Sequence, residues 1–501
     1  MKTIQYMGSK KELLKFIEDS IEDYTKDKKD KINTFYDAFS GSGRVAYYFS
    51  DKYNIISSDK QHFSKVILDA YLNNTITNKV IEEYLDVLNT LPVEYFEETD
   101  KWFTENYATE YNDGISVGED GNPKIWMKKN SMKIDMIRTK IDDPSFLKDT
   151  KKDQEIKNVL LLSLILGINK VSNVVGHQNG YLKKWSTNSK KDLFLENPFK
   201  ADEESKKHTD KSNKKVAKKK HTHTNLVGDI YEILPQQTAD IVYFDPPYGT
   251  NNENLSVATR YSSFYHLWNT IVKNDRPKLF GKAGKPIETK GWTPDLEKNK
   301  REVIIPKFKE LVSMCNSRYV AFSYSNQGLV TYDEFMKLFE ECGCTDIRCY
   351  KQGHKVNTQS KTAGKNVVFK VVGDTYEQLT EGKIQKEEKK VTFKSKKEED
   401  IDLSDKETVK KTFTIQKEVV EVECFETLEG ELYFEVKGLW INRDESTNDL
   451  EEYFFIMEKP LLSKEDIIKS VVKDLEENLT DDKHYSSNLK YLYTLIHNIE
   501  E

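Results

Sequence analysis

The stretch TFYDAFSGSGRVAYYF, residues 34–49, decides the fold class. Residues 34–39 have the apolar pattern of a short buried strand, residues 40–43 read Ser-Gly-Ser-Gly, and residues 44–49 have the pattern of a helix. Glycines directly after a strand permit a tight turn and let a ligand approach the backbone without interference from Cβ atoms. A second strand follows at residues 54–59. This order of elements predicts a doubly wound, Rossmann-like α/β sheet.

The alternation of strands and helices fades after this start and resumes late in the chain. Between residues 74 and 225 the sequence mixes aromatic, acidic and turn-forming residues around one apolar helix at 159–168. A strand at 240–245 restores the α/β pattern, and further strands are predicted at 319–324 and 366–372. The pattern therefore predicts a core that is interrupted by a long insert.

The charged residues are unevenly distributed along the chain. The net charge is −7, but residues 376–501 carry 19 Lys+Arg and 32 Asp+Glu, a net of −13. The first 375 residues carry a net of +6, and residues 205–220 contain eight lysines. Such asymmetry indicates that only one part of the chain contacts a polyanion. In the acidic part, strand-like alternation at 419–440 and a helical pattern at 464–500 predict a small α+β C-terminal domain.

Composition makes several classes of protein unlikely. Five cysteines in 501 residues do not form a disulfide framework. Residues 1–16 contain no apolar region of signal-peptide length, and the most apolar run, 159–168, is too short to cross a bilayer. Cys342, Cys344 and Cys349 cluster but lack a second half with zinc spacing. We therefore expect a cytoplasmic protein with no membrane contact and no metal.

The glycine turn is a candidate cofactor loop. Gly41, Gly43 and Ala46 satisfy the pattern G-x-G-x-x-A that is typical of dinucleotide-binding turns. Asp59 ends the next strand, where a carboxylate can accept hydrogen bonds from ribose hydroxyls. Taken alone, these residues leave open an ordinary loop, with Asp59 as a helix N-cap.

A second motif, Asp245-Pro246-Pro247-Tyr248, directly follows an apolar strand. Ligands of open α/β sheets bind at the carboxyl ends of the strands. The carboxylate and backbone carbonyls accept hydrogen bonds, and Tyr248 offers a π face, which together suit a flipped-out purine with an exocyclic amine. The alternative is a strand-ending turn with a packed tyrosine. An oxidoreductase, which the glycine turn alone would permit, does not explain this motif.

Together these motifs resemble the D12-class, Dam-like DNA adenine-N6 methyltransferases, in the motif order of the alpha group. Residues 6–10 (YMGSK) resemble the N-terminal cofactor motif, residues 37–43 the FxGxG motif, and residues 245–248 the catalytic DPPY. Asp59 falls at the family's ribose-binding acid, and residues 75–225 fall where the alpha group has its target-recognition insert. The resemblance implies a methyltransferase sheet with a largely helical insert. It also implies S-adenosyl-L-methionine as cofactor and a flipped adenine in double-stranded DNA as substrate.

The resemblance assigns cofactor binding to nine residues: Tyr6, Gly8, Lys10, Asp37, Phe39, Gly41, Gly43, Asp59 and Asp229. Tyr6 and Lys10 are expected at the methionine portion or the adenine edge of the cofactor. Asp59 is expected at its ribose and Asp229 at its adenine.

Catalysis is assigned to Asp245, Pro246, Pro247 and Tyr248. The Asp245 side chain and the Pro246 carbonyl can both accept hydrogen bonds from the adenine amine. This favours a pyramidal nitrogen whose lone pair is aimed at the methyl carbon, while Tyr248 holds the base by stacking. Positioning of this kind contributes on the order of 7–11 kcal/mol in favourable cases.

Two further segments are candidate DNA contacts. Residues 176–185 mix glycine, amide, aromatic and lysine side chains, which suits phosphate contact and base stacking by Lys183, Lys184 and Trp185. A surface turn is the alternative for this segment. Tyr261 and Tyr265 follow the DPPY motif and could line the base pocket or wedge into the gap left by a flipped base, with core packing as the alternative.

We therefore predict four regions along the chain. Residues 1–74 form the first part of the core, 75–225 the target-recognition insert, 226–375 the second part of the core, and 376–501 an acidic α+β domain. The expected function is adenine-N6 methylation of DNA in a prokaryotic restriction-modification or phage system. A cognate restriction endonuclease is the expected partner, and the expected location is the cytoplasm, at the nucleoid when DNA is bound.

Other functions fit parts of the pattern. Methyl transfer to RNA adenine, to cytosine N4 in DNA or to protein glutamine uses similar motifs, but the motif order and an aspartate at position 245 favour adenine in DNA. A DNA-binding or partner-binding module with a vestigial pocket would not need an intact DPPY and FxGxG.

Overall fold

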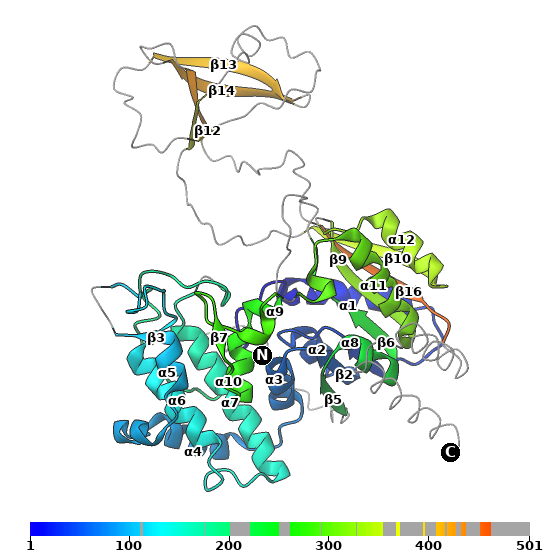
Figure 1. Ribbon diagram of the computed structural model, residues 1–501. Helices are drawn as coiled ribbons and strands as arrows, with labels where there is room; N and C mark the ends of the chain where they lie inside the picture. Colours follow the sequence, from blue (N-terminus) through cyan, green and yellow to red (C-terminus); the bar gives the residue numbers. More distant parts are fainter. Residues whose placement is uncertain are drawn as a thin grey trace, which may run out of the picture. The chain divides into compact units, whose positions relative to one another are not determined.

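Figure 1 shows the computed structural model of the chain. The structure describes residues 1–110, 114–174, 176–200, 221–249, 261–291, 293–326, 328–353 and 451–461, and the backbones of five strands between 367 and 436. Residues 1–354 and 450–501 form one compact unit, and residues 355–449 form a second.

A seven-stranded sheet in the order β10-β16-β9-β6-β1-β2-β5 forms the centre of the first unit. Its strands are β1 (Thr34–Asp37), β2 (Asn54–Asp59), β5 (His223–Val227), β6 (Thr238–Phe244), β9 (Asn316–Ser325), β10 (Thr345–Gly353) and β16 (Glu451–Glu458). The run from β5 to β9 is parallel, whereas β16 is antiparallel to both β9 and β10. This confirms the predicted α/β class with a mostly parallel sheet.

Helices cover both faces of the sheet. One face carries η1 (Lys10–Leu13), α1 (Leu14–Thr25), α2 (Arg44–Phe49) and α3 (His62–Leu72). The other face carries α8 (Ile230–Ile233), η4 (Leu234–Gln236), η6 (Asp295–Glu297), α11 (Arg301–Met314) and α12 (Tyr332–Glu341). Because both faces are buried, the central strands are continuous apolar runs, as in β6, where residues 241–244 are all buried.

A helical region follows α3 and is built on its own apolar cluster. It consists of α4 (Asn78–Asn89), η2 (Val93–Glu98), α5 (Trp102–Tyr107), β3 (Ala108–Thr109), β4 (Trp126–Met127), α6 (Lys128–Ile141) and α7 (Lys151–Val171). Helix α7 contains the predicted apolar helix and begins with a capping box between Thr150 and Asp153.

Later segments of the chain complete this helical region. They are α9 (Tyr261–Phe264), α10 (His266–Lys273), β7 (Leu279–Phe280), β8 (Lys285–Pro286) and η5 (Ile287–Thr289). Figure 1 shows α10 beside α7. Leu267 and Ile271 belong to the same buried apolar cluster as Leu164 and Ile168. The segment that follows the DPPY motif therefore packs on the helical region that follows α3.

The structure corrects the sequence-based boundary at residue 375. The predicted core strand at 366–372 is β11 (Val367–Lys370), which belongs to a second sheet in the order β12-β11-β15-β14-β13. The other strands of this sheet are β12 (Lys394–Ser395), β13 (Glu407–Ile415), β14 (Glu418–Glu426) and β15 (Leu432–Val436). Conversely, β16 returns from the acidic segment to the core sheet, while the helix predicted at 464–500 lies outside the described residues.

The return of β16 has a packing reason. Phe454 and Ile456 pack on the α1 face of the sheet, and Phe455 and Met457 pack on the α12 face. All four side chains are fully buried. An apolar run with both faces covered is stabilised at the centre of a sheet rather than in a half-exposed one.

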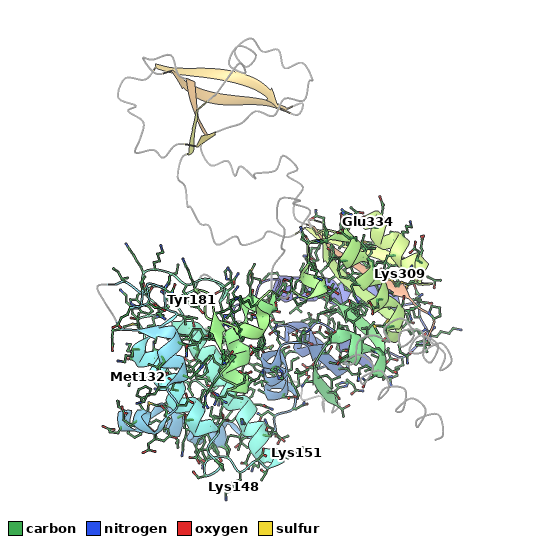
Figure 2. All side chains as sticks on the ribbon, in the orientation of Figure 1. Met132, Lys148, Lys151, Tyr181, Lys309 and Glu334 are labelled. Carbon is green, nitrogen blue, oxygen red and sulfur yellow. The ribbon has the colours of Figure 1, made fainter. Side chains whose placement is uncertain are left out.

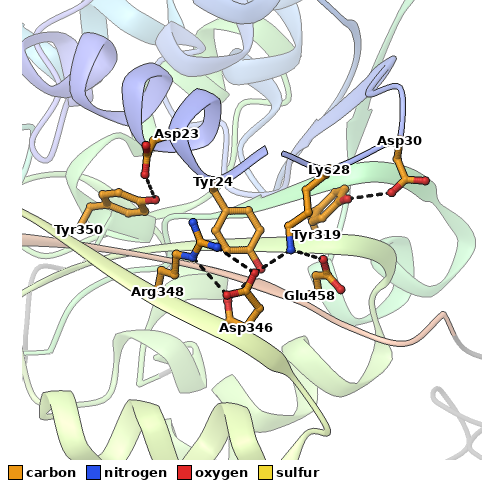
Figure 3. Close-up of polar contacts among 9 residues, drawn as sticks. All are labelled: Asp23, Tyr24, Lys28, Asp30, Tyr319, Asp346, Arg348, Tyr350 and Glu458. Carbon is orange, nitrogen blue, oxygen red and sulfur yellow. Dashed lines mark hydrogen bonds and ion pairs between the residues drawn. The ribbon is translucent and has the colours of Figure 1, made fainter. Parts of the chain in front are cut away.

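A polar network links α1 and Lys28 to β10 and to the last residue of β16, Glu458 (Figure 3). Lys28 bridges Asp346 on β10 and Glu458 on β16, and the Tyr24 hydroxyl donates to the Asp346 carbonyl at 2.9 Å. The Tyr350 hydroxyl donates to Asp23 at 2.7 Å. Of these contacts, the ion pair between Lys28 and Glu458 is the one that reaches β16, and the others join α1 and Lys28 to β10.

Candidate active site

The glycine turn and the DPPY motif lie side by side at the carboxyl edge of the sheet. They follow β1 and β6, which are parallel neighbours with Asp37 opposite Tyr243. The Ala38 N–H donates to the Tyr243 carbonyl at 3.0 Å. The chain moves to β2 on one side of β1 and later to β6 on the other, so this edge is the topological switch point where open α/β sheets bind ligands.

Asp59 is tied to the glycine turn. Its Oδ2 accepts the Gly41 N–H at 2.7 Å, and its Oδ1 accepts the Gln61 N–H at 2.8 Å. Burial raises the pKa of Asp59 to about 6, against the opposing effect of these two N–H groups. The N-cap alternative is wrong, because Gln61 is the N-cap of α3 and no side chain caps that helix, whereas one Asp59 oxygen holds the glycine turn.

Gly41 is required by the close approach of Tyr6. A Cβ at Gly41 would lie 2.8 Å from Tyr6 Cε1, and the backbone has a φ of +48°. Gly8, in the same N-terminal motif, has a φ of +73°, and a Cβ there would meet the Tyr261 hydroxyl at 2.8 Å. The structure thus brings the YMGSK segment onto the glycine turn.

Asp37 is a buried acid with one unused acceptor. Its Oδ2 accepts the Ala46 N–H at 3.1 Å, whereas its Oδ1 has no hydrogen-bond partner among the described residues. Burial, followed by the charge of Asp245, raises the pKa of Asp37 to about 8. A buried carboxylate oxygen without a partner suits a cationic ligand group, which would supply the missing donor.

The remaining cofactor candidates surround the same edge. Gly43 adopts a φ of +76° at the start of α2, and Phe39 packs near Phe244 with ring centroids 6.3 Å apart. The Gly228 N–H donates to the Asp59 carbonyl, which brings Asp229 to the end of the neighbouring strand. Asp229 caps α8 through the Tyr231 N–H and pairs with Lys60 at 3.0 Å.

Four polar side chains form a cluster at the DPPY turn, with Lys10 and Glu452 buried and Asp245 and Tyr248 partly buried. Lys10 Nζ lies 2.9 Å from Asp245 Oδ1 and 3.0 Å from Glu452 Oε1. Lys10 also donates to the Tyr248 hydroxyl at 2.7 Å. That hydroxyl lies 2.7 Å from Glu452 Oε1 and 2.9 Å from Asp245 Oδ1, so its single proton serves one carboxylate at a time.

The charges of this cluster act on one another. Burial raises the pKa of Asp245, Lys10 opposes that rise, and Glu452 adds to it. Burial alone lowers the pKa of Lys10, but Asp245 and Glu452 together raise it to about 12. Lys10 was predicted to contact the cofactor, and in the structure its ammonium is engaged by the two carboxylates.

Glu452 is the member that sequence reasoning missed. It is the second residue of β16, in the sequence EEYFFIME. The five apolar residues 453–457 between acids are the signal of a buried strand that could have found it. Its place at the site depends on a strand pairing far along the chain, which no local pattern encodes.

The structure separates the predicted DNA contacts into exposed and buried residues. Lys183 and Lys184 are exposed. Trp185 and Tyr265 are buried, so their role as direct DNA contacts stays a prediction. Tyr265 instead stacks on Tyr6 with ring centroids 4.5 Å apart.

The segment at 176–185 packs beside the helices that follow the DPPY motif. The Gln178 N–H donates to the Phe264 carbonyl at 2.8 Å, and His177 stacks on the Phe264 ring. The Tyr181 hydroxyl, labelled in Figure 2, donates to the Ala283 carbonyl at 2.6 Å. Tyr261 lies near Tyr6 and stays a candidate, whereas the lysine-rich residues 205–220 lie outside the described residues.

In the part of the chain that the structure describes, no three His, Cys, Asp or Glu side chains are grouped to hold a metal ion. None of the described helices has the length and apolar character needed to cross a bilayer.

Comparison with known proteins decides the family. Residues 6–290, more than half of the chain, match the D12 class of N6 adenine-specific DNA methyltransferases. The chain belongs to this family. The matched range contains the YMGSK, FxGxG and DPPY segments of this D12-class chain, whereas β16 and Glu452 lie beyond it.

Curated relatives are modification enzymes. The modification methylase LlaI of Lactococcus lactis subsp. lactis is 30% identical over 73% of this chain and 54% of its own length. The type II methyltransferase M.FokI of Planomicrobium okeanokoites is 28% identical over 70% of the chain and 49% of its length. The type II methyltransferase M.NlaIII of Neisseria lactamica is 25% identical over 69% of the chain and 90% of its length. The chain thus spans about half the length of the first two.

Proposed function

We propose that this D12-class chain transfers a methyl group from S-adenosyl-L-methionine to the N6 amine of an adenine flipped out of double-stranded DNA. The observation that carries the proposal is Asp245 at the switch point, next to the glycine turn. All contacts that described residues make with its carboxylate end on Oδ1. Its Oδ2 is therefore available to accept a hydrogen bond from an amine.

The residues at the glycine turn fit the cofactor. We assign its binding to Tyr6, Asp37, Phe39, Gly41 and Asp59. The unpartnered Asp37 Oδ1 suits a cationic group, and the absence of Cβ atoms at the turn lets a ligand approach the backbone. When bound, the cofactor supplies an electrophilic methyl group on a sulfonium sulfur.

The protein's part in the reaction is to position the amine. Asp245 and the Pro246 carbonyl accept hydrogen bonds from the N6 hydrogens, so the nitrogen lone pair points away from them. Pro247 stiffens the turn, because its ring restricts the backbone. Transfer would form an N–C bond as the C–S bond breaks with its electrons left on sulfur, and the surplus amine proton would then pass to water. Positive charge develops on the nitrogen, where an anionic acceptor stabilises it.

Recognition of DNA is assigned to the inserted helices and to the segment at 176–185. The exposed Lys183 and Lys184 would contact phosphates, and Tyr261 would lie at the base pocket. We further propose that the chain serves a prokaryotic restriction-modification system with a cognate endonuclease, because the relatives are described as modification and type II enzymes.

A methyl-transfer assay tests this function. Purified protein with labelled S-adenosyl-L-methionine should methylate duplex DNA, and sequencing that detects methylated bases should locate N6-methyladenine. The variant Asp245→Ala should lose transfer by at least about 100-fold, because the acceptor for the amine is gone. Circular dichroism should show that the variant still folds. Transfer to RNA or protein but not to DNA would contradict the substrate, and an active alanine variant would contradict the site.

A further inference from the structure

The antiparallel direction of β16 brings a carboxylate from beyond residue 450 to the catalytic edge. Parallel strands end at that edge, so an antiparallel strand must begin there. Glu452 pairs with Ser325, the last residue of β9, and with Gln352 near the end of β10. It therefore lies level with the turn that follows β6.

The pleat of the strand turns Glu452 toward Lys10. Side chains at alternate positions share a face, so Glu452 points to the same face as Phe454 and Ile456. Those two side chains pack in the cluster that contains Leu13, at the end of the helical turn that begins with Lys10. The 3.0 Å contact between Glu452 and Lys10 follows from this arrangement.

The contacts of the cluster join one cation to two carboxylates. Lys10 has three N–H donors, and they are directed to Asp245, Glu452 and the Tyr248 hydroxyl. The Tyr248 hydroxyl oxygen lies 2.7 Å from Glu452 and 2.9 Å from Asp245. If Lys10 paired with Asp245 alone, the pair would be neutral, but Glu452 adds a second negative charge and leaves the cluster at −1.

We propose that Glu452 is a positioning residue for methyl transfer: it holds Lys10 and Tyr248, so that Asp245 keeps its orientation toward the target amine and the cluster keeps its net negative charge. This inference rests on the function proposed above. A net-negative cluster favours the reaction, because positive charge moves onto the amine nitrogen as the methyl group is transferred. Glu452 acts through Lys10 and Asp245 and does not itself contact the base.

Kinetics of Glu452→Gln test this role. The variant should lower kcat about tenfold or more, the size typical of groups that orient a site residue through hydrogen bonds. KM for cofactor and DNA should change less than about twofold, because neither ligand contacts Glu452. The acidic limb of the pH–rate profile should move to lower pH, since loss of the Glu452 charge lowers the pKa of Asp245. A merely structural residue would not move that limb.

Two variants control this experiment. Glu458→Gln removes a carboxylate from the other end of the same strand and should leave kcat and the pH profile unchanged. Glu452→Asp keeps the charge, so it should keep the wild-type pH limb and recover part of kcat. A wild-type kcat and pH profile in Glu452→Gln would overturn the inference. The inference would also be overturned if Glu452→Gln and Glu452→Asp lost the same fraction of the rate and if this loss followed a drop in unfolding temperature.

Chemical labelling separates this inference from the proposed function. Lys10 should react slowly with an acylating reagent such as acetic anhydride, because two carboxylates and burial protect its ammonium. In Glu452→Gln its labelling, followed by peptide mass spectrometry, should rise at least about threefold, as half a pKa unit would give. Unchanged labelling would show that Glu452 does not hold Lys10. If the wild-type chain methylates no DNA, the proposed function fails, and the labelling still decides whether Glu452 holds Lys10.

Discussion

A lysine bridges two carboxylates at each end of β16, and the two clusters differ mainly in burial. At the catalytic edge, the side chains of Lys10 and Glu452 are 6% and 3% exposed. At the opposite edge, those of Lys28 and Glu458 are 20% and 29% exposed (Figure 3). Each lysine also pairs with an aspartate from a neighbouring part of the sheet.

The difference in burial distinguishes the cluster at the candidate active site from the cluster at the opposite end of the strand. A partly exposed ion pair is screened by water and contributes little, whereas a buried cluster is strongly destabilised when one charge is removed. The buried cluster therefore controls the charge of Asp245, whereas the exposed cluster adds little to stability. Substitutions at the two ends of β16 test this distinction.

The largest effect is expected from removing β16 altogether. A truncation after residue 374 deletes the acidic segment but also Glu452 and the strand between β9 and β10, so it should abolish both folding and methyl transfer. Gly353 and Glu451 are paired neighbours in the sheet, so a short turn can join them in place of residues 355–449. This internal deletion should keep the unfolding transition and the transfer rate, measured by circular dichroism and the methylation assay. Equal losses of folding and methyl transfer in the truncated chain and in the internal deletion would show that the second unit is needed for the core.

The next effect compares the two lysines. Lys10→Met leaves buried carboxylates without their cation and should cost about 3–5 kcal/mol of unfolding free energy, together with most of the methyl transfer. Lys28→Met should cost less than about 1 kcal/mol and leave the transfer rate unchanged. Urea unfolding and initial rates measure both quantities. Similar costs at the two ends would mean that burial does not distinguish the clusters.

A third prediction concerns pH and Asp37. Its folded-state pKa of about 8 lies above the value of about 4 in an unfolded chain, so the folded state binds the extra proton between these pH values. Asp37 therefore makes the protein less stable as pH rises from about 4 to 8. Asp37→Asn should remove this slope and raise stability at pH 8 relative to pH 5, measured by urea unfolding at both pH values. The same variant should weaken cofactor binding, because a cationic group loses its carboxylate partner.

The smallest effect is expected at the glycine turn. Gly41→Ala and Gly291→Ala both place a Cβ at positive φ, at a cost of about 1–2 kcal/mol each. At Gly291 nothing lies within 4 Å of that Cβ, whereas at Gly41 it meets Tyr6 at 2.8 Å. Only Gly41→Ala should weaken cofactor binding in calorimetry. Weakened binding in both variants would point to a general loss of stability.

Local elements were predictable because short stretches encode them. The strand predicted at 54–59 and the helix pattern within 44–49 coincide with β2 and α2, and the strand at 319–324 lies within β9. The sequence left open whether Tyr265 lies in the core or in a binding pocket, because an aromatic residue near a motif has the same local pattern in both. Trp185 is a second such case.

By itself, the sequence determined the family and the two motif-bearing turns, because tight turns, apolar strands and the DPPY and FxGxG patterns are properties of neighbouring residues. Only the tertiary structure decided that β16 crosses back into the core, that Glu452 joins Lys10 and Asp245, and that one buried oxygen of Asp37 has no partner among the described residues. These features arise from pairing and burial between residues hundreds of positions apart. Their energies depend on which groups are removed from water together, and this is set when the sheet assembles.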